Sequence, residues 1–319
     1  MNQYNCALVH IDIFGYRSRT DNLAKKPLIK VGYASMLEMK SRLAHKSMAI
    51  STRYPVMIIG GAEDKTNGCD ILRAFFESAG GDRATIGIIP SASREPTIVG
   101  DRYYQIFTRM GALRVQVLDI RYRTECDEVR WHDVLRDCSG IFITGGDQLR
   151  LRDLLGGTRV IDIIKERLDA KETVIAGTSA GAAIMGVDMI AGGSSGESPN
   201  QALVDLTNGL GFVPELLVDQ HFHNRNRMAR LLSAVAAHPN RLGVGIDEDT
   251  CIALADDGTF QVLGKGTITI VDPGDLTHTN YSNTGEDFPL SLHNLKVHVL
   301  KKGDCYDYKN RAVLQYQTQ

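Results

Sequence analysis

A serine flanked by glycines is the residue best suited to covalent chemistry in this chain of 319 residues. Ser179 lies in Gly177-Thr-Ser-Ala-Gly181, directly after the apolar run from Thr173 to Ala176. Glycines permit a tight turn from a strand into a helix, and such a turn raises the serine hydroxyl above the sheet edge. The helix N-terminus would stabilise developing negative charge. The pattern predicts a nucleophile; a glycine-rich turn that Ser179 merely caps is the alternative.

A second glycine turn indicates where the donors of an oxyanion hole would come from. The apolar run Ile141-Phe-Ile143 is typical of a buried strand, and Thr-Gly-Gly-Asp-Gln follows it. Because the carboxyl ends of parallel strands line one crevice, this turn and the serine can face each other. We therefore expect the backbone N–H groups of Gly146, Asp147 and Ala180 to form the oxyanion hole.

A nucleophilic serine also needs a base and a carboxylate that orients the base. His221 ends an apolar run and precedes a predicted helix, and His223 is its rival. The orienting acid would be Asp247, Glu248 or Asp249, and spacing alone does not choose among these three. His221 and His223 also resemble a metal-binding pair, but no third ligand cluster matches them, so we expect no metal.

The elements that position these residues follow an alternating pattern from Pro55 onward, in which short apolar runs separate helix-length stretches. This pattern predicts an α/β fold with a doubly wound, mostly parallel sheet. The predicted strands are Val56–Ile59, Thr85–Ile89, Arg114–Leu118, Gly140–Thr144 and Thr173–Ala176. The predicted helices are Asn67–Ala79, Gly100–Met110, Glu125–Arg136 and Arg159–Leu168. A third glycine turn, Gly60-Gly-Ala-Glu-Asp64, follows the first strand.

The chain changes character after Thr250, where short β-like segments are separated by turns such as Asp257-Gly258. These segments are Cys251–Ala255, Gln261–Leu263, Thr267–Val271 and Lys296–Leu300. We expect them to form a β-rich C-terminal layer on a single α/β domain that spans residues 51–319.

The composition excludes several classes of protein. With 36 basic and 38 acidic side chains, the formal charge is -2, which argues against binding nucleic acid or a membrane surface through bulk charge. No apolar run approaches the ~18 residues that a membrane span needs. The first residues show no secretory signal, so we expect a cytoplasmic protein. Six scattered cysteines without a C-x-x-C pair are typical of reduced thiols.

The first 50 residues differ from the rest, with eight Lys or Arg against three Asp or Glu. We assign residues 1–50 to an N-terminal extension of unknown role. A peripheral appendage, or an upstream over-extension of the reading frame, is one interpretation. A basic docking arm is the other.

The chain between about residues 55 and 311 resembles the cyanophycinases, a family of serine hydrolases that also contains aspartyl dipeptidases. The resemblance rests on several motifs that occur in a consistent order. The motifs that carry the resemblance are Gly60–Lys65, Pro90–Ser93, Gly145–Gln148, Gly177–Gly181, Gly193–Pro199 and Asp219–Leu231. The resemblance implies a fold similar to class I glutamine amidotransferases (flavodoxin-like). It also implies a triad of Ser179 as nucleophile, His221 as base and Glu248 as orienting acid. A serine in place of the amidotransferase cysteine argues against glutaminase chemistry.

The substrate that the resemblance implies is cyanophycin, a poly-aspartate backbone with arginine on each β-carboxyl group, and the product is the β-Asp-Arg dipeptide. Five residues on either side of His221 would bind the polymer: Asp219, Gln220, Arg225, Arg227 and Arg230. Arginine side chains bind carboxylates in a bidentate manner that lysine does not match. A solvated basic helix start is the alternative for the three arginines. We expect a homodimer that needs no cofactor.

Two other functions compete with degradation of the polymer. One is an isoaspartyl or aspartyl dipeptidase on the same scaffold, which would prefer short acidic peptides. The other is a catalytically silent module that binds an anionic ligand through its glycine turns and arginines. The presence of Ser179, His221 and Glu248 counts against the silent module.

Overall fold

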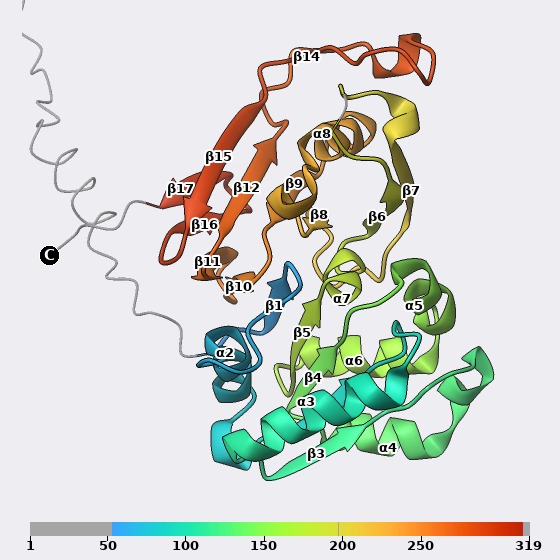
Figure 1. Ribbon diagram of the computed structural model, residues 1–319, viewed down its shortest axis with the longest axis vertical. Coiled ribbons are helices and arrows are strands. Elements are labelled where there is room, and N and C mark those ends of the chain that lie inside the picture. The colour runs from blue at the N-terminus through green and yellow to red at the C-terminus, as the bar shows by residue number, and fades with distance from the viewer. Residues whose placement is uncertain (1–52, 197, 315–319) are drawn as a thin grey trace, which may run out of the picture. The chain divides into compact units, whose positions relative to one another are not determined.

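Five apolar segments form the parallel half of a central sheet in the computed structural model, which describes residues 53–196 and 198–314 (Figure 1). These strands are β1 (Val56–Ile59), β2 (Thr85–Ile89), β3 (Arg114–Val117), β4 (Gly140–Ile143) and β5 (Val174–Thr178). They lie in the order β1-β5-β4-β2-β3, and every neighbouring pair is parallel. The predicted parallel sheet is confirmed, and β5 extends two residues further toward Ser179 than predicted.

Helices cover both faces of this half of the sheet. Because successive side chains of a strand point to opposite faces, Met57 and Ile59 pack in one apolar cluster and Ile58 in another. The first cluster includes residues of α2 (Asp70–Ser78) and α3 (Pro96–Met110). The second includes residues of α4 (Val129–Asp137), α5 (Gln148–Leu155) and α6 (Arg159–Asp169). The sheet is therefore doubly wound, as predicted.

Three helices begin three or four residues away from their predicted starts, and the first of them, α2, begins at Asp70 instead of Asn67. The helix α3 begins at Pro96, four residues before the predicted start, because proline is well suited to the first turn, where its missing N–H is not needed. The segment Arg123–Asp127 forms the 3₁₀ turn η2, so α4 begins only at Val129. A further 3₁₀ turn, η1, occupies Gly81–Arg83.

The strands after Thr250 do not form the single C-terminal layer that we expected. Four of them extend the central sheet beyond β1: β10 (Thr250–Leu254), β11 (Thr259–Gly264), β16 (Cys305–Asp307) and β17 (Ala312–Leu314). Each pairs antiparallel with its neighbour, beginning with β10 against β1. Because β1 would otherwise leave a row of backbone groups unpaired, β10 completes its hydrogen bonding.

The remaining long C-terminal strands join a second, four-stranded sheet, which has the order β15-β12-β9-β8. Its strands are β8 (Leu216–Gln220), β9 (Leu242–Ile246), β12 (Thr267–Asp272) and β15 (Lys296–Lys301). The strands β8 and β9 are parallel and connected through α8 (Met228–Ala237). The chain then passes from β9 to β10, and so from the second sheet to the central one, through residues 247–249 (Figure 1).

Shorter elements complete the described part of the chain. The hairpin of β6 (Asp188–Gly193) and β7 (Val204–Asn208) follows the four-residue helix α7 (Ala180–Ala183), and β13 (His278–Thr279) pairs with β14 (Leu292–His293). The 3₁₀ turns η3, η4 and η5 occupy Gln201–Leu203, His223–Arg225 and Tyr281–Asn283.

The remaining predictions about the chain concern membrane spans, thiols and domains. Within residues 53–196 and 198–314, no helix combines the length and apolar character needed to cross a bilayer. The thiols of Cys126, Cys138 and Cys251 are buried, and burial raises the pKa of Cys138 to about 12. The extension predicted over residues 1–50 lies outside the described residues. The single domain predicted over residues 51–319 stays a prediction.

Candidate active site

Ser179 follows the last residue of β5 in a backbone conformation that few side chains adopt. Its φ is 53° and its ψ is -110°. The Ser179 N–H donates to the Ile59 carbonyl of the neighbouring strand at 3.0 Å, and the Ser179 carbonyl accepts from Ala182 and Ala183 in α7. Such strain persists only where the surrounding structure over-determines it, and it concentrates at functional sites. The turn places the serine at the carboxyl edge of the central sheet, as the glycine pattern predicted.

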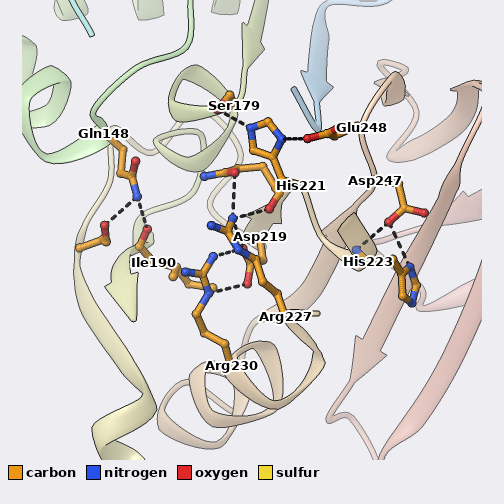
Figure 2. A network of polar contacts seen from close by, with 12 residues as sticks. Gln148, Ser179, Ile190, Asp219, His221, His223, Arg227, Arg230, Asp247 and Glu248 are labelled. Atoms are coloured by element: carbon orange, nitrogen blue, oxygen red, sulfur yellow. Dashed lines mark hydrogen bonds and ion pairs between the residues drawn. The ribbon is translucent and has the colours of Figure 1, made fainter. Parts of the chain in front are cut away.

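A continuous row of hydrogen bonds joins Ser179 to His221 and Glu248 (Figure 2). The Ser179 Oγ lies 2.9 Å from His221 Nε2, and His221 Nδ1 lies 2.7 Å from Glu248 Oε1. An ionised carboxylate only accepts, so His221 donates from Nδ1 and its Nε2 lone pair faces the hydroxyl. The three residues come from the ends of β5, β8 and β9, and so from both sheets.

Asp247 and Asp249, the carboxylates on either side of Glu248 in the sequence, have other partners. Asp247 accepts from the backbone N–H of His223 at 2.9 Å and lies 3.0 Å from its ring Nδ1. Asp249 accepts from the Asp64 N–H at 2.8 Å and pairs with Lys265 at 2.9 Å. Figure 2 shows His223 pointing away from Ser179. Among the described residues, no group of three or more His, Cys, Asp or Glu is arranged to hold a metal ion.

The third glycine turn supports the histidine. The His221 N–H donates to the Gly60 carbonyl at 2.9 Å, and the Asp249 N–H donates to the Gly61 carbonyl at 2.9 Å. Gly61 has a φ of 99°, and a Cβ there would lie 2.4 Å from His221 Cε1. Only glycine therefore lets the imidazole ring lie directly against this turn.

The surroundings of His221 keep its imidazole neutral near pH 7. Burial lowers the pKa of His221 below its ordinary value, the hydrogen bond and charge of Glu248 oppose this, and the charges of Arg225 and Arg227 lower it further. The residue is 8% exposed. A base must be unprotonated to accept a proton, so the lowered pKa favours His221 as the base.

The predicted oxyanion hole requires one correction. The Asp147 N–H donates to the Ala92 carbonyl at 2.9 Å, so it is not available, and the Asp147 side chain caps α5. The N–H groups of Gly146 and Ala180 have no acceptor among the described residues. A Cβ on Gly145 would lie 3.1 Å from Ser179 Cβ, so this turn closely approaches the serine. Gly146 and Ala180 therefore remain as candidate donors.

The five residues predicted to bind substrate fall into a buried and an exposed group. Arg230 Nε donates to Asp219 Oδ2 at 2.9 Å, and Arg227 Nη1 donates to Gln220 Oε1 at 2.9 Å (Figure 2). Asp219, Arg227 and Arg230 are 1%, 8% and 3% exposed. Arg225 is exposed, and its guanidinium has no partner in the described part of the chain. A solvated basic helix start therefore does not describe Arg227 or Arg230.

The buried group carries excess positive charge. One carboxylate, Asp219, faces the guanidiniums of both Arg227 and Arg230. Burial lowers the pKa of Arg227 to about 10, which leaves it protonated at neutral pH. Its Nε–H has no acceptor among the described residues. With two guanidiniums and one carboxylate, this buried group therefore keeps a net positive charge.

Two polar residues near the site were not singled out from the sequence. Gln148, at the start of α5, donates to the Ala191 carbonyl at 2.6 Å, which fixes its side chain (Figure 2). Asn224 Oδ1 accepts from the Glu248 N–H at 3.0 Å and so holds the acid. Their positions beside the glycine turn and beside His221 are the sequence signals that point to them.

The fold and the site define the class of the protein. A serine in a strained strand-to-helix turn contacts an oriented histidine on a doubly wound α/β scaffold, and the N–H groups of Gly146 and Ala180 have no acceptor within residues 53–196 and 198–314. This arrangement is that of a serine hydrolase.

The chain belongs to peptidase family S51, whose model matches residues 56–262. The cyanophycinase of Trichormus variabilis is 56% identical to it over 281 residues, covering 88% of this chain and 92% of that protein. The cyanophycinase of Synechococcus elongatus is 51% identical over 258 residues, covering 81% and 80%. A crystal structure of a peptidase from an acI-B1 actinobacterium matches with a TM-score of 0.56 at 20% identity, covering 79% and 96%, which shows a shared fold.

Proposed function

We propose that this chain is a serine peptidase that degrades cyanophycin, with Ser179, His221 and Glu248 as its catalytic residues. The observation that carries the chemistry is the hydrogen-bonded row from the Ser179 hydroxyl through His221 to Glu248. The substrate is supported by relatives named cyanophycinase that share 51–56% identity over four fifths or more of the chain.

In this mechanism His221 Nε2 takes the Ser179 proton as Oγ attacks a main-chain carbonyl carbon of the poly-aspartate backbone. The N–H groups of Gly146 and Ala180 stabilise the oxyanion of the tetrahedral intermediate. His221 then protonates the leaving amine, and the acyl-enzyme remains. Water, deprotonated by His221, cleaves the ester and restores the serine. Glu248 keeps the histidine in the required tautomer and stabilises the imidazolium.

Recognition of the substrate follows from its charges, because each β-Asp-Arg unit presents one carboxylate and one guanidinium. The Arg225 backbone N–H donates to the His221 carbonyl at 3.1 Å, and the charge of Arg225 lowers the pKa of His221, so this exposed arginine lies close to the base. We assign it the bidentate contact with a substrate carboxylate. Arg227 and Arg230 hold Asp219 and Gln220 and add positive charge beneath this contact.

Assays of the purified protein on three substrates test this function: insoluble cyanophycin, β-Asp-Arg and isoaspartyl dipeptides. We expect soluble β-Asp-Arg to accumulate from the polymer. Faster cleavage of isoaspartyl dipeptides than of the polymer would identify a dipeptidase instead. Binding of the polymer without release of any product would identify an anion-binding module.

Four further properties belong to the proposal. The class I glutamine amidotransferase-like fold is supported by the neighbouring strands β3-β2-β4-β5, which follow the 2-1-3-4 part of the flavodoxin-like order. We also propose that the enzyme is a cytoplasmic homodimer and works without a cofactor. Light scattering of the purified protein tests the homodimer, and fractionation of cells that express it tests the cytoplasmic location. Activity after dialysis against a chelator tests whether a metal cofactor is needed.

A further inference from the structure

A buried carboxylate that the mechanism does not use lies beneath the serine turn. The Glu63 side chain, in the third glycine turn, is 1% exposed. It accepts a hydrogen bond from Thr178 Oγ1 at 2.6 Å and another from the Tyr103 hydroxyl, and Lys65 Nζ lies 3.0 Å from its Oε1. Three donors from three separate segments therefore converge on one carboxylate.

This set of partners satisfies the buried carboxylate from three sides. An ionised group is tolerated in the interior only when it is paired and hydrogen-bonded, and Lys65 supplies the opposite charge. Lys65 also lies over the Tyr103 ring, 5.5 Å from its centroid. Burial, followed by the charge of Glu63, raises the pKa of Tyr103 well above its ordinary value, so the phenol remains a donor.

Glu63 connects the two halves of the site. Thr178, its first partner, immediately precedes Ser179, whose backbone is strained. On the other side, Glu63 belongs to the same glycine turn as Gly60, whose carbonyl accepts from the His221 N–H, and Gly61, which lies against the imidazole. One carboxylate thus ties the serine turn to the support of the histidine.

We propose that Glu63 is a positioning residue that holds the Ser179 turn and the Gly60–Gly61 turn in register, so that the serine and the histidine are in contact before substrate binds. The inference rests on the proposed function, because it concerns the same serine and histidine. A misplacement of about 1 Å at reacting groups costs roughly a hundredfold in rate.

Glu63→Gln and Thr178→Val test this role. The first variant keeps the side-chain volume but removes the charge and presents an amide to three donors; the second removes one donor without changing shape. For both we expect kcat to fall about ten- to a hundredfold, with KM changed by less than about twofold. Because the two residues share one hydrogen bond, the double variant should lose less than the product of the single losses.

Matched controls separate positioning from a general loss of stability. Asp272, in β12, is another buried carboxylate, 1% exposed and paired with Arg311 at 2.6 Å, and Thr173 is a buried threonine just before β5. Asp272→Asn and Thr173→Val should lower the melting temperature as the test variants do, with kcat unchanged. If kcat falls in the controls as it does in the Glu63 and Thr178 variants, or in neither group, the proposal is overturned.

The rate of covalent labelling by a fluorophosphonate distinguishes a failure of this inference from a failure of the proposed function. The parent should be labelled and Ser179→Ala should not, while Glu63→Gln should be labelled at least about tenfold more slowly than the parent. Labelling of Glu63→Gln at the parent rate would refute the positioning role and leave the serine mechanism intact. A parent that is neither labelled nor active would refute the proposed function, and the inference with it.

Discussion

The two sheets of the molecule supply different parts of the site. The nine-stranded sheet presents Ser179 directly after β5, in a turn held by backbone hydrogen bonds to α7 and to Ile59 of the neighbouring strand β1. The four-stranded sheet presents His221 after β8 and Glu248 after β9, and these depend on side chains for their orientation. The nucleophile is therefore positioned by one sheet and the base and acid by the other, so the contact between Ser179 and His221 exists only because the two sheets meet.

Removal of the nucleophile is the most severe test of this division. Ser179→Ala should lower cyanophycin hydrolysis by at least about a thousandfold, because without the hydroxyl no acyl-enzyme forms. The circular dichroism spectrum and melting temperature should stay near those of the parent, since the hydroxyl has no packing role. A variant that retains more than about a tenth of the turnover would contradict the assignment of Ser179.

Glu248→Gln tests the contribution of the second sheet. Loss of the carboxylate should lower kcat roughly a hundred- to ten-thousandfold, because the imidazolium loses its partner. Glu248 raises the pKa of His221, so its removal should lower that pKa and move the acidic limb of the pH profile of kcat/KM to lower pH. Asp249→Asn, whose parent carboxylate faces Lys265 instead, is the control and should leave the limb in place. A limb that moves upward, or moves equally in both variants, argues against Glu248.

Arg225 is exposed and Arg230 is buried, although both follow β8, so the same substitution should affect them differently. Arg225→Lys keeps the charge but loses the planar fork, so kcat/KM for cyanophycin should fall about ten- to a hundredfold. An uncharged activated ester, which has no carboxylate for the fork, should be hydrolysed at nearly the parent rate.

Arg230→Lys should behave differently because Arg230 is buried against Asp219. We expect a free energy of unfolding lower by about 1–3 kcal/mol, measured by urea denaturation. We also expect kcat/KM to fall by similar factors for cyanophycin and for the uncharged ester. If the two lysine variants show the same pattern of losses, the division into a substrate ligand and a buried scaffold is wrong.

The smallest effects are expected outside the hydrogen-bonded row. His223→Ala should keep activity within about twofold, because the His223 ring contacts Asp247 and points away from the serine. Overnight chelation should likewise leave the rate unchanged. Loss of activity on chelation that zinc or manganese restores would instead show that His221 and His223 act as metal ligands.

The sequence predicted the parallel strands well but not the partners of the later ones. The run Thr267–Asp272 has the same β-like character as Thr250–Leu254, yet β12 joins the second sheet and β10 joins the central sheet. Residue type specifies that a segment is extended and half-buried, whereas its partner is set by which edge is open. Here β10 pairs with the otherwise open edge of β1, and β12 pairs with the otherwise open edge of β9.

By itself, the sequence determined the local features: the serine in its glycine turn, the buried strands before it, and a histidine at the end of an apolar run. Only the tertiary structure decided which of three successive acids meets His221, that the Asp147 N–H is taken by Ala92, and that Arg230 is buried. Periodicity and turn chemistry act between neighbours in the chain, so they can be recognised in a sequence. Hydrogen bonds and burial instead depend on distances between segments tens of residues apart, as between Ala92 and Asp147, and only packing sets those distances.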